Sequence, residues 1–276
     1  MPTRNRTTGF TLIELSIVLV IIGLIIGAVM VGRDLMASAA IRAQVSQIES
    51  LNSAVNTFKV KYGGLPGDLL ASKAAAFGLF SSSLGNSTGY GDDNGSITSF
   101  HAQRIPYFIG EPVIFWRQLS DAQLIDGSYS ITGAAAGNIT VTGSVAVNPT
   151  SADMMSAHVP KAKVGINASI VVGSYPGTNY YALSGINSFD RATLYFGGST
   201  NPLTAQEAYS IDTKIDDGIP AKGNVLAMDS TIVVGGLYQP LPGWMPLNTI
   251  NTCVASGKYA TNPGTAQSCS LQFKFQ

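Results

Sequence analysis

A single carboxylate, Glu14, lies inside a long apolar run. Residues 10–32 contain no other charged side chain. A carboxylate in or near a membrane is costly unless it is paired or lies at the interface. Three interpretations are open. Thr11 and Glu14 fit the pattern of a helix capping box, Glu14 lies at the level of the lipid headgroups, or it meets a positive charge of a neighbouring chain.

Two cysteines, Cys253 and Cys269, define a second candidate site near the end of the chain. In an oxidising compartment such a pair is most simply a disulfide. Closing that loop would contribute on the order of 3 kcal/mol. A metal site at the pair lacks partners, because neither of the two histidines, His101 and His158, is near in sequence.

A loop rich in glycine and acidic residues suggests a calcium site. Asp92, Asn94 and Gly95 align with the middle of an EF-hand-like loop, which needs oxygen ligands at alternate positions and a glycine for the turn. However, Tyr90 stands where the first acidic ligand belongs, and His101 stands where the bidentate glutamate belongs. The segment therefore predicts either Ca²⁺ on Asp92 and Asn94 or a plain turn.

A second acidic group, Asp212, Asp216 and Asp217, lies at the end of a predicted helix. Acids at a helix C-terminus oppose the helix dipole. They indicate either a cation site or a solvated helix end.

Composition and motifs argue against catalysis and nucleic-acid binding. Lys+Arg and Asp+Glu both number 16, so there is no net positive field to attract phosphate, and no direct contact with nucleic acid is expected. Charged residues make up only 12% of the 276 residues. The sequence has no H-E-x-x-H, P-loop or C-x-x-C motif. We predict that the chain is not an enzyme.

The apolar run at residues 10–32 is long enough to cross a membrane. At 1.5 Å per residue it spans about 34 Å. Arg4 and Arg6 precede it, whereas Arg33 and Asp34 follow it and cancel. The positive-inside bias then places residues 1–9 in the cytoplasm and the rest of the chain across the membrane.

A secretory signal peptide is the first alternative. Its apolar region is usually about 7–15 residues long and ends in a small-residue cleavage site. Here the run is longer, and the first A-x-A pattern, at residues 37–39, lies beyond Arg33 and Asp34. The segment therefore fits a membrane anchor better.

The start of the run resembles a known family. Residues 9–15, GFTLIEL, look like the processing motif of type IV prepilins and type II secretion pseudopilins, and the likeness extends over residues 4–32. The resemblance implies that a prepilin peptidase cuts after Gly9 and methylates the new amino group of Phe10. It also implies that Glu14 pairs with the amino terminus of an adjacent subunit. A cation and an anion at the same membrane depth cost less paired than apart.

The family implies a place and partners for the chain. It would be a single-pass protein of the bacterial inner membrane, with its N-terminus cytoplasmic and its head periplasmic or extracellular, that later enters a filament. Its partners would be the peptidase, other pilin or pseudopilin subunits, the inner-membrane assembly platform and membrane lipid. A C-terminal disulfide loop also resembles many type IV pilins.

One departure from major pilins concerns the apolar segment. It lacks the helix-breaking proline that many of them carry in its second half, and has Gly23 and Gly27 instead. Their G-x-x-x-G spacing permits close helix packing, although glycine is also simply common in membrane helices.

The helix is expected to continue to residue 62. Apolar residues recur every three or four positions, which is one helical face, from Ile41 through Val45, Ile48, Leu51, Val55 and Phe58 to Tyr62. Polar residues such as Arg42, Gln44 and Gln47 occupy the other side. We expect this face to pack on the sheet of its own head rather than form a coiled-coil seam.

The remaining sequence predicts a mixed head with an antiparallel sheet. Residues 70–110 read as a loop region and residues 111–125 as a helix. Strands are expected near 128–147, 168–172, 179–183, 190–196, 223–234 and 271–275. Thr204 and Glu207 form a second capping box before another helix. The fold class is α+β and pilin-like, with a leader at 1–9, a membrane helix at 10–32, a helical spine at 33–62 and a head at 63–276.

The function expected from these features is structural. The large head favours a minor or specialised pilin, or a large pseudopilin, of a type IV pilus or type II secretion filament. Two alternatives stay open: a binding module at the filament tip (an adhesin or a DNA-capture subunit), and a tethered exported protein that never polymerises.

Overall fold

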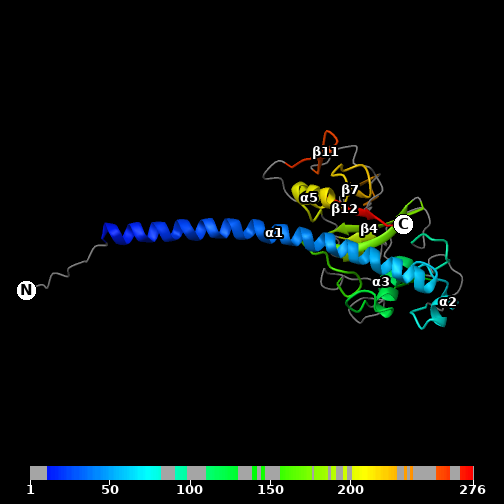
Figure 1. Cartoon of the computed structure of the whole chain (residues 1–276). Coiled ribbons are helices and arrows are strands. Elements are labelled where there is room, and N and C mark those ends of the chain that lie inside the picture. The colour runs from blue at the N-terminus through cyan, green and yellow to red at the C-terminus, as the bar shows by residue number, and fades with distance from the viewer. Residues whose placement is uncertain are drawn as a thin grey trace, which may run out of the picture. The chain divides into compact units, whose positions relative to one another are not determined.

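A computed structural model gives the fold of the chain (Figure 1). It describes residues 11–81, 91–97, 110–129, 139–141, 144–146, 156–175, 177–185, 188–190, 195–197, 201–228, 233–234, 237–238, 253–261 and 268–275. Within them, a long N-terminal helix is followed by short helices and antiparallel strands, which confirms the predicted α+β class.

The helix α1 runs from Leu12 to Tyr62, 51 residues without a break. It was predicted over residues 10–62; Thr11 lies outside the helix, and Phe10 lies outside the described residues. The helix ends because Gly63 adopts a left-handed φ of 70° and its N–H bonds the Lys59 carbonyl at 2.8 Å. Glycine takes up that conformation without a steric penalty.

The chain divides into two compact units, Met1–Ala40 and Ile41–Gln276. In the described part of the first unit, no residue is buried. The second unit contains the rest of α1 and the whole head, including its hydrophobic core. The predicted boundaries at residues 9, 32 and 62 stay predictions.

The second half of α1 is striped, largely as the periodicity predicted. Ile41, Ile48, Leu51, Ala54, Val55, Phe58 and Tyr62 are all buried. They belong to the same core as residues of the strands, so this half packs on its own head. Burying an aliphatic or aromatic side chain of this size stabilises a fold by about 1.5–3 kcal/mol.

Two details of this stripe were predicted wrongly. Val45 is only half-buried, whereas Gln44, placed on the polar side, is 0% exposed. The reason is a hydrogen bond: Gln44 Oε1 accepts from the backbone N–H of Lys163 at 2.8 Å. A buried amide is tolerated where it satisfies a backbone group that would otherwise lack a partner.

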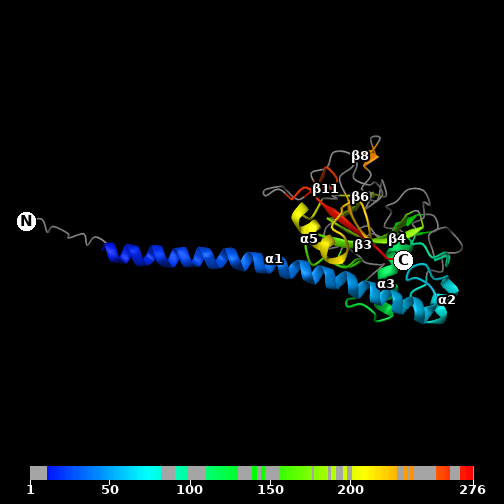
Figure 2. The ribbon, with the colours of Figure 1, turned by 45° about the horizontal axis from the view of Figure 1, so that its top comes forward.

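A four-stranded antiparallel sheet forms the centre of the head (Figures 1 and 2), in the order β3-β4-β12-β7. Its members are β3 (Ser169–Tyr175), β4 (Thr178–Ser184), β12 (Ser270–Lys274) and β7 (Val225–Met228). The strands β3 and β4 make a hairpin, and the C-terminal β12 lies between β4 and β7. The strands predicted near 168–172, 179–183 and 271–275 are therefore confirmed. The strand predicted over 223–234 is confirmed only for Val225–Met228, because Val233 and Val234 pair in a different sheet.

The last strand buries side chains on both faces. Leu271 and Phe273 are buried on one face, and Gln272, which alternates with them, is only 4% exposed on the other.

Short hairpins account for the other strands. The pairs are β1 (Ile139–Val141) with β2 (Ser144–Ala146), β5 (Ser188–Asp190) with β6 (Tyr195–Gly197), β8 (Val233–Val234) with β9 (Leu237–Tyr238), and β10 (Val254–Ala255) with β11 (Lys258–Tyr259). The segment 190–196, predicted as one strand, thus contributes to two strands that pair with each other.

Two helical predictions need correction. Residues 70–110 contain a helix, α2 (Ala71–Ala76), where three consecutive alanines have high helix propensity and Ala74 is fully buried. The helix α3 (Glu111–Asp121) ends five residues before Asp126. Gln123 turns left-handed there, with φ 56°, and the Leu124 N–H bonds the Leu119 carbonyl at 3.1 Å. This is a Schellman ending, which the sequence did not suggest because its left-handed residue is not glycine.

The second capping box is confirmed at the start of α5 (Ala205–Ile215). Thr204 Oγ1 accepts from the Glu207 N–H at 3.2 Å, and the Thr204 N–H donates to Glu207 Oε2 at 2.8 Å. These two bonds satisfy backbone donors that a helix start otherwise leaves open.

A close backbone approach fixes the loop after α1. A Cβ added to Gly91 would lie 2.1 Å from the Leu69 carbonyl oxygen. A Cβ on Gly67, which has a left-handed φ of 83°, would lie 2.5 Å from the Glu111 carbonyl oxygen. Any side chain at either position must therefore push backbone segments apart.

We predict that Gly91→Ala lowers the free energy of unfolding by about 3 kcal/mol, because backbone atoms cannot move aside as a flexible side chain can. Urea unfolding of the full chain in detergent micelles, followed by the fluorescence of the buried Trp116, measures this. Gly173→Ala is the matched control, since nothing lies within 4 Å of its added Cβ. Equal midpoints for the two variants would contradict the prediction.

Candidate functional site

The carboxylate of Glu14 forms a capping box at the start of α1. Its Oε2 accepts from the Thr11 N–H and from the Thr11 hydroxyl, both at 2.8 Å. In return, the Glu14 N–H donates to Thr11 Oγ1 at 3.3 Å. The first of the three interpretations of Glu14 is therefore confirmed for this chain on its own.

The capping box leaves half of the carboxylate available. All the hydrogen bonds that Glu14 accepts from described residues go to Oε2, and its other oxygen, Oε1, has no such partner. A carboxylate can accept up to about four hydrogen bonds. Capping and a second interaction through Oε1 are thus compatible.

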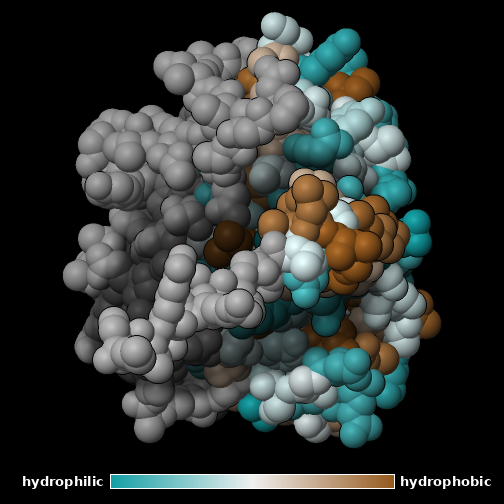
Figure 3. Space-filling view, turned by 90° about the vertical axis from the view of Figure 1, so that its left-hand side faces the viewer, coloured by the Kyte–Doolittle hydropathy of each residue, from teal (hydrophilic) through white to brown (hydrophobic). Residues whose placement is uncertain are grey.

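The side chains around Glu14 are apolar and unburied. Large hydrophobic residues from Leu12, 86% exposed, to Met36, 68% exposed, cover α1 on every side. Figure 3, which views the molecule from the end where α1 begins, shows a cluster of hydrophobic side chains there. Among the described residues, α1 is the one helix long and apolar enough to cross a membrane. A helix apolar all round needs lipid or other helices around it.

Comparison with protein families identifies a known motif at the start of this helix. The family model of the prokaryotic N-terminal methylation motif matches residues 4–30. The chain carries the prepilin-type signature. A long N-terminal helix followed by a C-terminal antiparallel sheet is also the pilin-like layout. Comparison with curated proteins and with solved structures gives no significant match.

The prepilin-type signature covers three predicted site residues. Gly9 and Phe10, at the expected cleavage point, lie outside the described residues. Glu14 lies in the first turn of α1, as described. The signature implies processing by a prepilin peptidase and assembly with other pilins. It is the mark of a structural protein family, and the apolar first part of α1 is consistent with a membrane anchor.

A disulfide joins the two cysteines of this prepilin-type chain. Cys253 and Cys269 are bonded, with Cα atoms 5.1 Å apart, and both are fully buried. Cys269 directly precedes β12, and its carbonyl accepts from the Leu203 N–H at 3.0 Å. The bond therefore ties the β10–β11 hairpin to the start of β12, a central strand of the sheet.

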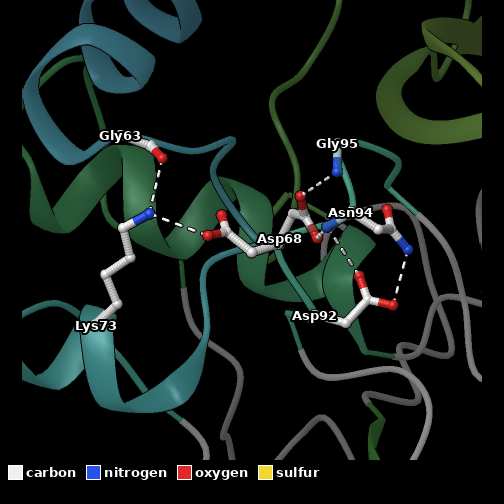
Figure 4. A network of polar contacts seen from close by, with 7 residues as sticks. Gly63, Asp68, Lys73, Asp92, Asn94 and Gly95 are labelled. Carbon is white, nitrogen blue, oxygen red and sulfur yellow. Dashed lines mark hydrogen bonds and ion pairs between the residues drawn. The ribbon is translucent and has the colours of Figure 1, made fainter.

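The predicted calcium loop belongs to a larger polar network around Asp68 (Figure 4). Asp68 is 1% exposed, and its carboxylate accepts from the backbone N–H groups of Asn94 at 3.3 Å and Gly95 at 2.8 Å. Nearby, Lys73 bonds the Gly63 carbonyl at 2.7 Å and forms an ion pair with Asp93 at 3.1 Å. The network connects the end of α1 to the loop at residues 91–97.

Asp92 and Asn94 lie together, but the oxygens of both already accept hydrogen bonds from the protein, that of Asn94 from the Ser96 N–H at 2.7 Å. Asn94 donates to Asp92 through its backbone at 3.2 Å and through its side-chain amide at 2.7 Å. This is the turn that the sequence offered as the alternative to calcium. Tyr90 and His101 lie outside the described residues.

The group of carboxylates that could hold a cation includes residues that sequence reasoning missed. Oxygens of Asp68, Asp92 and Glu111 all lie within 4.8 Å of one another, and Asp68 and Glu111 are buried. No spacing rule connects these three positions, because the fold brings them together from a loop, a turn and the start of α3. Calcium at Asp92 and Asn94 stays a prediction.

In the second acidic group, Asp212 and Asp216 accept hydrogen bonds from the protein. Asp212, expected at a solvated helix end, is 0% exposed; its carboxylate accepts from the Tyr259 hydroxyl at 2.8 Å and the Gly218 N–H at 3.2 Å. Asp216 accepts from the N–H groups of Asn224 and Val225. These donors offset the unfavourable helix dipole, and the expectation of a solvated end was wrong for Asp212.

Burial affects two of these acids in the same way. Burial raises the pKa of Asp68 to about 6, with Asp92 adding to the effect and the N–H bonds from Gly95 and Asn94 opposing it. Burial also raises the pKa of Asp212 to about 6, against the hydrogen bonds from Tyr259 and Gly218. In both cases the folded protein favours the protonated form more than the unfolded chain does.

We predict that the head is more stable near pH 4 than near pH 7. A carboxyl whose pKa is raised from 3.8 to about 6 on folding contributes stability below pH 4 that is lost as the pH rises through 6. The loss is on the order of 3 kcal/mol for each acid. Urea unfolding of the full chain across this range measures it, in EGTA and again with CaCl₂.

The variant Asp68→Asn should remove about half of this pH dependence, while Asp126→Asn, at an exposed carboxyl, should leave it unchanged. A flat profile in the unmodified chain would contradict the prediction. The calcium arm tests the predicted metal site separately. An ion on this cluster would raise stability at pH 7 far more than at pH 4, and Asp92→Asn would abolish that gain.

Proposed function

We propose that this chain is a structural subunit of a type IV pilus or type II secretion filament. The single observation that carries the proposal is the prepilin-type motif at residues 4–30, which includes the first part of α1, where the helix is apolar and exposed all round. A prepilin peptidase cuts after Gly9, the new amino terminus of Phe10 is methylated, and α1 packs against the α1 helices of other subunits.

Glu14 supplies the charge that guides subunit addition. Cleavage creates a cation at Phe10, close in sequence to the carboxylate. The free Oε1 of Glu14 supports a contact with the amino terminus of an adjacent subunit, since the capping box uses only Oε2. In apolar surroundings such a pair is favoured over two separate charges.

The chain is held in the bacterial inner membrane before assembly. Arg4 and Arg6 keep the N-terminus in the cytoplasm, and the head lies on the opposite side. The disulfide between Cys253 and Cys269 supports an oxidising location for the head. The remaining partners are the inner-membrane assembly platform and lipid, and no catalytic activity is assigned.

The head favours a minor or specialised pilin, or a large pseudopilin, over a major subunit. The compact unit that contains it runs from Ile41 to Gln276, larger than a filament-forming head requires. Counting labelled subunits on purified filaments separates the roles: a structural subunit lies along the filament, whereas a tip-binding module is rare and terminal.

We predict that Glu14→Gln reduces the amount of chain assembled into filaments at least tenfold and leaves leader cleavage intact. Glutamine keeps the capping-box geometry but carries no charge, so the variant separates pairing from capping. The measurement is the amount of chain in sheared filaments, together with the mass of the mature N-terminus.

Thr11→Val is the matched control. It removes the hydroxyl that contacts Glu14 in the capping box but leaves the carboxylate charged. Assembly should persist in this variant. If Thr11→Val and Glu14→Gln fail equally, Glu14 acts only as a cap; if filaments contain Met1 to Gly9, the processing step itself is wrong.

A further inference from the structure

A groove of about 450 Å³ runs along the exposed side of α1 in the head. Its floor is a stretch of α1 with short side chains, Ala43, Ser46 and Ser50, beside Gln47. One wall is the turn after α3, with Asp126 and Tyr129, and the other is the loop before β3, with Lys161 and Lys163. All of these belong to the same compact unit.

The lysine wall is fixed to the floor by two glutamines. Gln47 Nε2 donates to the Lys161 carbonyl at 3.0 Å, and Gln44 Oε1 accepts from the Lys163 N–H at 2.8 Å. Gln47 Oε1 is buried and has no hydrogen-bond partner. The backbone of this wall is therefore held in place, while both ammonium groups extend from exposed residues.

The opposite wall is also held in place. Ser120 donates to the Gly127 carbonyl at 2.9 Å, and the ring of Tyr129 lies 6.3 Å from that of Trp116 in the core. Asp126 is exposed on this wall. Within the described residues, Asp126, Lys161 and Lys163 form no ion pair. The groove thus has a negative wall and a positive wall, and no described residue forms an ion pair with either.

A helix that enters this groove must be free on all sides and must carry both signs of charge. From Ile41 onward, α1 packs on its own head, so only its earlier part is free. In that part, the described charged residues are Glu14, Arg33 and Asp34. In the proposed assembly, Glu14 pairs with the amino terminus of an adjacent subunit. Arg33 and Asp34 remain, and both are exposed and form no ion pair with a described residue.

The shape of the segment around Arg33 and Asp34 also suits the groove. Adjacent residues on a helix diverge by about 100°, so Arg33 and Asp34 face different walls. Gly32 and Ala37 keep the segment thin, and short side chains on both helices let their axes approach to about 8 Å. The purely apolar residues before Gly32 would leave both charged walls without partners.

We propose that the groove receives the Arg33–Asp34 segment of α1 from a second copy of the chain, with Asp34 facing Lys161 and Lys163, and Arg33 facing Asp126. The inference rests on the proposed function, because it requires subunits to assemble. It adds a charged contact between the head of one subunit and the Arg33–Asp34 segment of the next, in addition to the packing between apolar helices.

Zero-length carbodiimide cross-linking of assembled filaments tests the contact directly. Filaments are grown from a mixture of ¹⁴N- and ¹⁵N-labelled chains and analysed by mass spectrometry. The expected product is an amide between Asp34 of one label and Lys161 or Lys163 of the other. Filaments that cross-link elsewhere but never at this pair would overturn the inference, although the proposed function would stand because filaments had formed.

Charge exchange gives the second measurement. Asp34→Lys, and separately Lys161→Asp with Lys163→Asp, should each reduce assembly at least tenfold, and combining all three changes should restore it. Leader cleavage and disulfide formation show that each variant is still inserted and folded. Lys258→Asp, at an exposed lysine on β11, is the matched control and should assemble normally.

Failure of the combined variant, while Lys258→Asp assembles, would overturn the contact. The other partner that could contact two lysines is a membrane surface. If the lysine variants assemble normally, and amine labelling of Lys161 and Lys163 falls when the full chain is reconstituted into vesicles with about 30% phosphatidylglycerol instead of neutral lipid, the groove is a lipid surface and the inference is wrong. If the unmodified chain never assembles, the proposed function fails first.

Discussion

The two halves of one helix, α1, need different surroundings, and the fold of the head depends on this constraint. The first half of α1 buries nothing within the chain, so its hydrophobic surface requires lipid or other helices. The second half buries a single stripe in the core of the head. Because α1 is one unbroken helix from Leu12 to Tyr62, the same element carries the exposed apolar surface and organises the head.

The attachment of the head to α1 combines apolar packing with specific polar contacts. Phe58 and Val55 fill the core, but Gln44 and Gln47 determine where the loop at residues 161–163 lies. Apolar side chains tolerate small shifts in register, whereas an amide that satisfies a backbone N–H does not. The glutamines thus define the position of the head along the helix at the end nearest the free segment.

Local patterns in the sequence predicted much of this structure, and contacts between distant segments account for the errors. Both capping boxes, at Thr11 and Thr204, follow from a spacing of three residues, and so they were predictable. The burial of Gln44 depends on a loop more than a hundred residues away, and the acidic group at Asp68 and Glu111 depends on three separate elements. Periodicity marks which face of a helix is apolar, but it does not show which polar residue on the border of that face finds a buried partner.

The position of β12 has a consequence for how the molecule matures. This strand occupies the middle of the sheet, yet it is formed by residues 270–274, after every other strand in the chain. Without β12, β4 and β7 lack the strand that lies between them, so the core is incomplete until residue 274 has been synthesised. Until then the sheet has open strand edges, which can pair with another chain.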